Sequence, residues 1–260
     1  MSKKLIYFIG TFLCFLFITS VARAQVDQEV AYILNTFSFL ICGFLVMWMA
    51  AGFLFLESGL VTTKSVSTIA AKNIGKFAIV SVVFYLFGYN LGYGVPEGGF
   101  IGNFSIWTDS TSIETGYSDA SDWFFQALFV CATCSIVSGA VAERIKIWPF
   151  FLFSAILGGI IYPIQMGWEW GGGWLDVLGF ADFAGSTLVH ACGGSAALAG
   201  VILLGPRLGR FSKKGKPVNM APFAPSSIPL VALGTFILWM GWFGFNGGSQ
   251  LALGSFDDAT

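Results

Sequence analysis

The stretch AYILNTFSFLICGFLVMWMAAGFLFLES, at residues 31–58, decides the class of fold. It carries one charged side chain, Glu57, near its end. An α-helix needs about 20 mostly apolar residues to cross a bilayer, and this stretch meets that length. Apolar stretches recur along the chain, so we predict six membrane spans. These are expected at about 31–58, 73–94, 122–142, 147–166, 183–204 and 228–250.

The composition supports the same class. Of the 260 residues, 56% are hydrophobic and 10% are charged, whereas soluble domains carry about 25% charged residues. This balance excludes a disordered chain, a secreted disulfide scaffold and an ordinary cytosolic enzyme. The 13 Lys and Arg are matched by 14 Asp and Glu, which leaves no basic surplus for nucleic acid. We therefore predict an all-α polytopic membrane protein surrounded by the lipid bilayer.

The first 24 residues have the features of a secretory signal peptide. Lys3 and Lys4 form a positive start, an apolar stretch follows to Thr19, and Ala22-Arg23-Ala24 offers a small-x-small cleavage pattern. Cleavage would leave residues 25–260 as the mature chain, with its amino terminus outside the cytoplasm. The alternative is a short first helix that is not removed.

Basic residues predict the orientation of the spans. Outside the first 24 residues, every Lys and Arg falls in or beside the connections at 59–72, 143–146 and 205–227, which would be cytoplasmic. These residues are Lys64, Lys72, Lys76, Arg144, Lys146, Arg207, Arg210, Lys213, Lys214 and Lys216. The opposite segments carry only acidic charges: Glu97, Asp109, Glu114, Asp119, Asp122, Glu169, Asp176 and Asp182.

Two ionisable side chains are expected inside the spans, Glu57 and the single histidine, His190. An ionisable group in a membrane helix often marks a functional pathway, although His190 could instead hydrogen-bond between packed helices. Asp182 opens the fifth span, where it could cap the helix, act in function, or do both. Helical spacing predicts one shared face for Asp182, Ser186, His190, Gly193 and Gly194.

A second group of candidates lies at the outer mouth. Ser249 ends the sixth span, and Phe245 lies one turn further in on the same face. Trp168 and Trp170 occupy an outer loop. Aromatic faces, a hydroxyl and nearby acids suit a small cation, while anchoring at the membrane interface is the alternative role for the tryptophans.

The remaining patterns favour packing over chemistry. Gly158-Gly159 and Gly193-Gly194 are expected to let helices approach closely. Cys131 and Cys134 have CxxC spacing, but they lie in an apolar helix and are interpreted as small buried residues. The sequence contains no phosphate-binding loop, HExxH or GxSxG motif. We therefore expect no enzymatic activity, no metal site and no cofactor.

Four stretches closely resemble the ammonium transporter (Amt/Mep/Rh) family, and its Amt-type members in particular. They are AGFLFLESGLV (51–61), FQALFVCATCSIVSGAVAERIK (125–146), WGGGWLDVLGFADFAGSTLVHACGG (170–194) and GTFILWMGWFGFNGGS (234–249). The likeness runs in order over the whole predicted mature chain. DFAGSTLVH together with GWFGFNGGS forms a highly specific pair.

The resemblance implies roles for individual residues. Trp170, Phe129 and Ser249 match the residues that recruit ammonium or methylammonium in an outer vestibule. Phe129 and Phe245 match two stacked rings that gate the pore. Asp182 matches the aspartate that shapes and polarises the vestibule, and His190 matches the first of two pore histidines.

The resemblance also implies a larger assembly. Members of the family have roughly eleven spans in two inverted repeats, of which this chain would hold six, so we expect an incomplete sequence that lacks the second histidine. A homotrimer in a bacterial inner membrane is implied, with a PII-type regulatory protein as a partner on the cytoplasmic face. Two alternatives stay open: an ammonium sensor of the same fold, and a Rhesus-type channel for NH₃ or CO₂.

Overall fold

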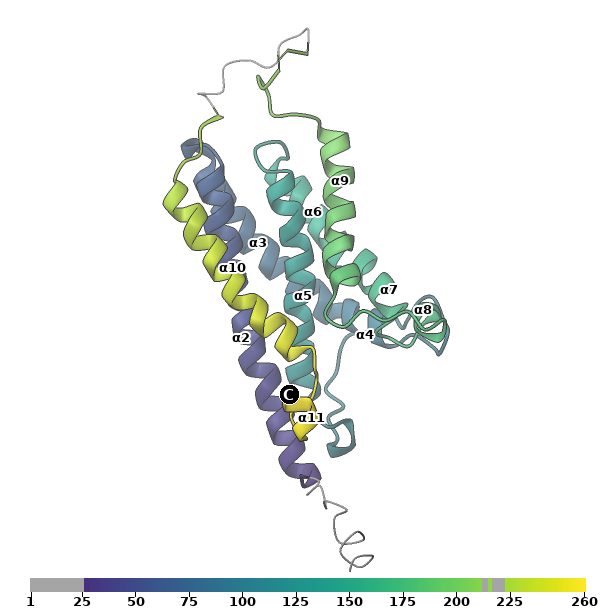
Figure 1. Ribbon diagram of the computed structural model, residues 1–260. Coiled ribbons are helices and arrows are strands. Elements are labelled where there is room, and N and C mark those ends of the chain that lie inside the picture. Colours follow the sequence, from purple (N-terminus) through teal and green to yellow (C-terminus); the bar gives the residue numbers. More distant parts are fainter. Residues whose placement is uncertain (1–25, 212–214, 217–222) are drawn as a thin grey trace, which may run out of the picture.

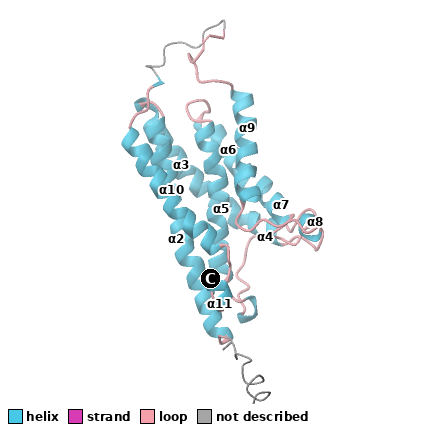
Figure 2. Cartoon of the chain, in the orientation of Figure 1, coloured by secondary structure: helices cyan, strands magenta, loops and turns pink. Residues whose placement is uncertain are grey.

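A computed structural model describes residues 26–211, 215–216 and 223–260. Within these ranges the secondary structure is helical, with loops between the helices and no β-strand (Figure 2). The predicted signal peptide lies outside the described residues. The α-helices are α2 (Gln28–Leu60), α3 (Val66–Val83), α4 (Tyr89–Tyr93), α5 (Asp119–Ala140), α6 (Ile147–Ile156), α7 (Tyr162–Gly167), α8 (Trp174–Val177), α9 (Cys192–Leu204), α10 (Ile228–Gly248) and α11 (Phe256–Ala259).

Six continuous helical segments of the described chain are long and apolar enough to cross a membrane. Short π-helical turns at Phe84–Gly88 and Leu157–Ile161 join α3 to α4 and α6 to α7, and a third at Ser186–Ala191 leads into α9. The six segments are Gln28–Leu60, Thr63–Tyr93, Asp119–Ala140, Ile147–Gly167, Ser186–Leu204 and Ile228–Gly248. The predicted all-α polytopic fold is thus confirmed, while the second segment begins ten residues earlier than the expected residue 73.

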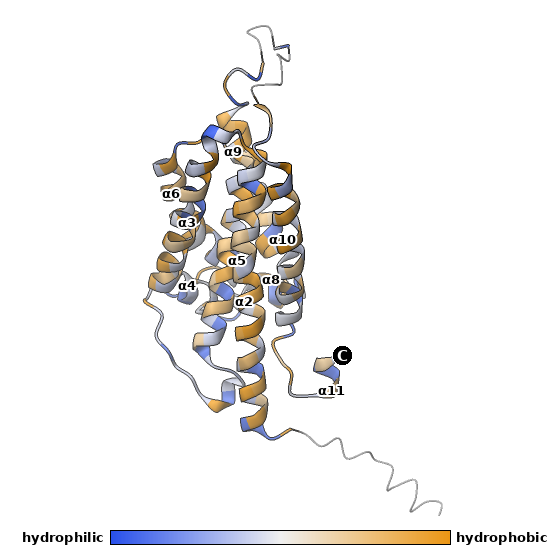
Figure 3. Cartoon of the chain, turned by 90° about the vertical axis from the view of Figure 1, so that its left-hand side faces the viewer, coloured by the Kyte–Doolittle hydropathy of each residue, from blue (hydrophilic) through white to orange (hydrophobic). Residues whose placement is uncertain are grey.

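Hydrophobic residues predominate along the long helices (Figure 3), and many of them are exposed on the bundle. On α2 the side chains of Phe37, Phe44 and Trp48 are exposed, and α10 exposes further aromatic rings such as Phe236 and Phe243. A soluble protein rarely exposes a continuous apolar surface of this kind. Lipid chains or other membrane helices would cover these side chains in a bilayer.

The connections that follow α2, α5 and α9 meet at one end of the bundle, at the top of Figure 1. There the carboxylate of Glu143 accepts hydrogen bonds from Thr62 and forms an ion pair with Arg207. Burial opposes ionisation of Glu143, but these hydrogen bonds outweigh it and lower its pKa to about 2. Three loops that are far apart in sequence are thereby joined through one carboxylate.

Helices α2 and α10 cross at backbone contact, and they form the most extensive helix pair of the described chain. A Cβ atom on Gly234 would lie 2.4 Å from the backbone nitrogen of Leu56 and 2.7 Å from the carbonyl oxygen of Gly52. Further along the same crossing, a Cβ on Gly241 would lie 2.7 Å from the carbonyl oxygen of Leu45. Only glycine leaves room for two helix backbones at this separation.

The glycine pairs predicted to allow close packing behave differently from one another. A Cβ on Gly158 would meet Val80 at 2.9 Å, and one on Gly193 would meet the carbonyl oxygen of Thr133 at the same distance. A Cβ on Gly194 would have no neighbouring atom within 4 Å. Among the described residues the predicted close approach is therefore found at Gly158 and Gly193, and no neighbour packs against Gly194.

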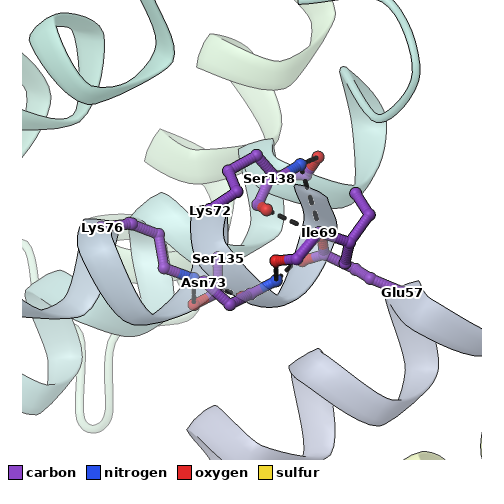
Figure 4. Close-up of polar contacts among 7 residues, drawn as sticks. All are labelled: Glu57, Ile69, Lys72, Asn73, Lys76, Ser135 and Ser138. Carbon is purple, nitrogen blue, oxygen red and sulfur yellow. Dashed lines mark hydrogen bonds and ion pairs between the residues drawn. The ribbon is translucent and has the colours of Figure 1, made fainter. Parts of the chain in front are cut away.

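A buried charge network joins α2, α3 and α5 (Figure 4). Oxygen Oε2 of Glu57 lies 3.4 Å from Nζ of Lys72 and accepts hydrogen bonds from Asn73 and Ser138. Nζ of Lys76 donates to Asn73 and, at 2.6 Å, to the Ser135 hydroxyl; those contacts complete the network.

The positions of Lys72 and Lys76 correct the sequence analysis. Both lysines were assigned to an inner connection and its flank, and Glu57 and His190 were expected to be the ionisable groups inside the spans. In the structure, Lys72 and Lys76 are 3% and 2% exposed. The early start of α3 moves Lys72 from the expected connection into the helix. Both lysines lie on a face of α3 that packs against α2 and α5, where hydrogen-bond partners satisfy them.

The α2–α10 crossing generates a first prediction. Gly234→Ala in the full-length protein forces the two backbones apart, so we expect stability to fall by about 1–3 kcal/mol. The matched control is Gly139→Ala, because a Cβ at Gly139 would make only an ordinary contact, at 3.7 Å from Cγ of Glu57. Unfolding midpoints in detergent measure the effect, and equal midpoints for the two variants would contradict the packing argument.

The buried network generates a second prediction. Glu57→Gln removes the one carboxylate near two buried lysines, so the free energy of unfolding should fall by about 3–5 kcal/mol. The double variant Glu57→Gln/Lys72→Met removes one of the uncompensated charges, and we expect it to recover part of this loss. Unfolding of the full-length protein by denaturant supplies both values. A double variant less stable than Glu57→Gln would show that the charges are not coupled.

Candidate functional site

Two phenylalanine rings from distant parts of the chain stack in the interior. Phe129 lies midway along α5 and Phe245 lies in the last turn of α10. Their ring centroids are 3.8 Å apart with an angle of 5° between the planes, and both side chains are buried. At this separation the ring faces are in van der Waals contact, so nothing passes between them. The structure thus brings together the two residues predicted to form a gate.

A cavity of about 180 Å³ lies against this ring pair on the side of Ser249. Its wall contains all three residues predicted for recruitment, Phe129, Trp170 and Ser249. The ring centroids of Trp170 and Phe129 are 6.0 Å apart. The other lining residues are Tyr93, Tyr117, Asp122, Phe125, Gln126, Phe183 and Leu251. We call this space the vestibule cavity.

Hydrogen bonds decide which faces of Ser249 and Trp170 a ligand can meet. The Ser249 hydroxyl donates to the carbonyl oxygen of Phe245 at 2.9 Å, which leaves its lone pairs as acceptors. The Trp170 indole N–H donates to the carbonyl oxygen of Asp182 at 2.7 Å, which leaves the ring face available. Both residues therefore present electron-rich groups, as a small cation requires.

Asp182 organises the loop that precedes α9. Its carboxylate accepts backbone N–H bonds from residues 185–188, at 2.8–3.0 Å. Gly185 has φ of 90°, a left-handed conformation that favours glycine. Burial opposes ionisation of Asp182, but the four backbone hydrogen bonds outweigh it and lower its pKa. Asp182 does not line the vestibule cavity, but its carbonyl oxygen accepts the hydrogen bond of Trp170, which does.

His190 lies beside Phe245 and does not line the vestibule cavity. Its ring stacks on Trp242 with centroids 4.9 Å apart and meets the edge of Phe245 at 5.5 Å. Nδ1 faces the carbonyl oxygen of Gly185 at 3.1 Å, so a neutral ring carries its proton there and leaves Nε2 as an acceptor. A second cavity of about 410 Å³ is lined by Ala184, Ser186, His190, Trp242 and Asn246.

The predicted common face around His190 is partly wrong. Ser186 and His190 do line the same cavity. Asp182 precedes the helix, and a Cβ on Gly193 would point at Thr133 of α5. The cause is the π-helical turn at Ser186–Ala191, which breaks the regular spacing on which the prediction was based.

Sequence reasoning missed part of the vestibule cavity. Asp122 was assigned to the acidic outer segment, and Gln126 was not considered. The signal was present: residues 122, 126 and 129 are spaced at i, i+4 and i+7, which places them on one face of α5. Trp168, proposed together with Trp170, instead donates its N–H to the carbonyl oxygen of Phe100 and does not line the cavity.

Comparison with known proteins identifies the family. The model of the Ammonium Transporter Family matches residues 37–259. A relative from Synechocystis sp., whose name describes an ammonium transporter, is 45% identical over 95% of this chain and 56% of its own length. Ammonium transporter Amt2 of Archaeoglobus fulgidus is 42% identical over 82% of this chain and 47% of its own length.

Solved structures agree with this assignment. A structure titled "Sensor Amt Protein" matches with a TM-score of 0.81 and 33% identity, over 90% of this chain and 58% of its own. Mep2 of Candida albicans matches with a TM-score of 0.73 and 28% identity, over 88% of this chain and 51% of its own. The chain thus spans about half the length of the relatives that it matches. Because the family model covers most of the described helices and the relatives align along nearly the whole chain, the protein belongs to the ammonium transporter family.

Proposed function

We propose that the full-length protein containing this chain conducts ammonium or ammonia across a membrane. The observation that carries the proposal is one cavity lined by Trp170, Phe129 and Ser249, in which the ring of Phe129 is stacked on Phe245. Family membership and the names of the relatives support the same substrate. The chain is a multi-pass membrane protein, and we find no reason in its chemistry to propose an enzyme.

The chemistry of the vestibule cavity suits the ammonium ion. Ammonium is a small cation with four N–H donors and no acceptor. The faces of Trp170 and Phe129 attract a cation, with an energy of about 0.5–2 kcal/mol per ring, and the lone pairs of Ser249 accept an N–H bond. These groups would concentrate the ion before it meets the closed ring pair.

Passage beyond the ring pair requires a change in the ion and in the rings. An isolated charge is very costly to move into apolar surroundings, whereas neutral ammonia is not. We propose that the ion loses a proton before it passes, while one ring of the Phe129–Phe245 pair moves aside. Nε2 of His190 would then accept an N–H bond from ammonia in the second cavity, or relay the proton separately.

We extend the proposal to the assembly and its location. Similarity to the family supports a homotrimer in which each subunit has its own pore, in a bacterial inner membrane with the mature amino terminus outside. A PII-type regulatory protein is the proposed partner on the cytoplasmic face. The cluster of Glu143, Thr62 and Arg207 lies at the end of the bundle that this orientation assigns to the cytoplasm.

A sensor is the second candidate function. One observation favours it: the structural match with a TM-score of 0.81 is titled "Sensor Amt Protein". A sensor would use the same vestibule cavity to bind ammonium without sustained conduction. Uptake and binding measured separately distinguish the two functions.

Growth rescue tests the transport proposal. We expect the full-length protein to restore growth of a transport-deficient bacterium on low ammonium at acidic pH, because little free ammonia is then available to diffuse through the bilayer. Immunoblots of the membrane fraction control for expression. A protein that reaches the membrane in normal amounts and gives no rescue would favour the sensor.

Replacement of Trp170 tests recruitment. Trp170→Leu removes the aromatic face, so the half-saturation concentration for methylammonium uptake should rise roughly two- to thirty-fold, as expected from the loss of one cation–π contact. Uptake curves are normalised to the amount of folded protein in the membrane.

Phe245→Ala provides the comparison for Trp170→Leu. It acts one turn further in, at the ring pair, and we expect it to change the maximal rate or the selectivity more than the half-saturation concentration. If Trp170 serves only as an interface anchor, Trp170→Leu lowers the amount of protein and leaves the concentration dependence unchanged.

A further inference from the structure

The vestibule cavity has a polar wall that the recruitment scheme does not use. Asp122 and Gln126 line it beside Phe129, on the same face of α5. Ser249 caps the end of α10 and Trp170 lies in the turn between α7 and α8. Asp122 and Gln126 on α5 therefore add a separate wall to the site. The question is which ligand this wall fits.

Asp122 brings a buried carboxylate to the cavity. The residue is 3% exposed, its Oδ2 accepts a hydrogen bond from the Tyr89 hydroxyl at 2.6 Å, and the amide group of Gln126 also donates to the carboxylate. The ten residues that line the cavity include no Lys, Arg or His. A buried carboxylate is costly unless a positive charge or several hydrogen bonds compensate it. Two hydrogen bonds compensate this carboxylate in part, and the cavity wall supplies no cation, so a cationic ligand would provide the missing charge.

The side-chain oxygen of Gln126 is a buried hydrogen-bond acceptor to which no described group donates. Its side chain is 4% exposed, and among the described residues its Oε1 has no hydrogen-bond partner. Buried polar atoms are nearly always paired, and each exception calls for an explanation. Oε1 can only accept a hydrogen bond, so the group that would satisfy it must be a donor.

We propose that Asp122 and Gln126 are specificity-determining residues of the vestibule, which bind the charge and one N–H group of the incoming ion. The ligand class is a small monovalent cation that donates hydrogen bonds, such as ammonium or a monoalkylammonium ion. This inference rests on the proposed function and deepens it. Aromatic faces attract any cation, whereas the acceptor of Gln126 selects one that carries N–H groups.

A structural role for Asp122 makes a different prediction. Asp119 and Asp122 both lie in the first turn of α5, where a negative charge favours the helix dipole. Asp119 accepts hydrogen bonds from the backbone and the hydroxyl of Ser110 and does not line the cavity. Asp119→Asn is therefore a matched control, because it removes a charge from the same helix turn and leaves the cavity unchanged.

The test is calorimetric titration of the purified full-length protein with methylammonium chloride. Asp122→Asn keeps the shape and the contact with Tyr89 but removes the charge, so we expect the dissociation constant to rise about ten-fold, as for the loss of a charge-assisted hydrogen bond. Asp122→Glu should recover part of the affinity, and Asp119→Asn should bind as the wild type does. Gln126→Met, of similar size and without an acceptor, should weaken binding several-fold.

Each outcome bears on the inference. Equal dissociation constants for wild type, Asp122→Asn and Gln126→Met overturn it, even if the wild type transports methylammonium normally. If Asp122→Asn does not fold, Gln126→Met decides the question by the same measurement. A wild type that binds but does not transport overturns the transport proposal alone, and the shift in Asp122→Asn still supports the inference. A wild type that does not bind methylammonium overturns both.

Discussion

The backbone contact between α2 and α10 is the constraint on which the candidate site depends. Helix α10 carries Phe245 and Ser249, and its position is set mainly by its crossing with α2 at Gly52 and Gly234. Its contact with α5 is made by side chains, through the stacked ring of Phe129. In a membrane no hydrophobic effect drives two helices together, so close packing at glycine supplies the attraction. The separation of those two backbones therefore sets whether the two rings meet.

Charged groups inside the bundle fall into two kinds, which the structure separates by their partners. Glu57 of α2 and Lys72 of α3 form an ion pair between their helices, and Ser138 of α5 hydrogen-bonds to both. These contacts hold the three helices together. The carboxylate of Asp122 is hydrogen-bonded by the side chains of Tyr89 and Gln126, with no basic residue beside it in the cavity wall. Glu57 and Asp122 are thus buried to a similar degree, but Glu57 holds helices together, whereas Asp122 is proposed to bind the ligand.

Local irregularities of the helices place the remaining site residues. Four backbone N–H groups donate to the carboxylate of Asp182 and so close the loop around it. The backbone carbonyl oxygen of Asp182 accepts the indole N–H of Trp170 and orients that ring. The π-helical turn that follows turns His190 toward Phe245 and Trp242. One aspartate therefore holds both the start of this helical segment and the indole of Trp170, although it does not line the vestibule cavity itself.

The sequence by itself determined the all-helical class, the number of apolar helices and the family, because these depend on composition, on length and on motifs that are local in the chain. It also singled out Phe129, Phe245, Trp170 and Ser249 through resemblance, and the structure brings these residues together. Tertiary structure alone decided that Lys72 and Lys76 are buried, that Gly193 packs against the backbone of α5, and that Asp122 and Gln126 complete the cavity wall. Burial depends on which helices pack against a given face, and local spacing does not specify that choice.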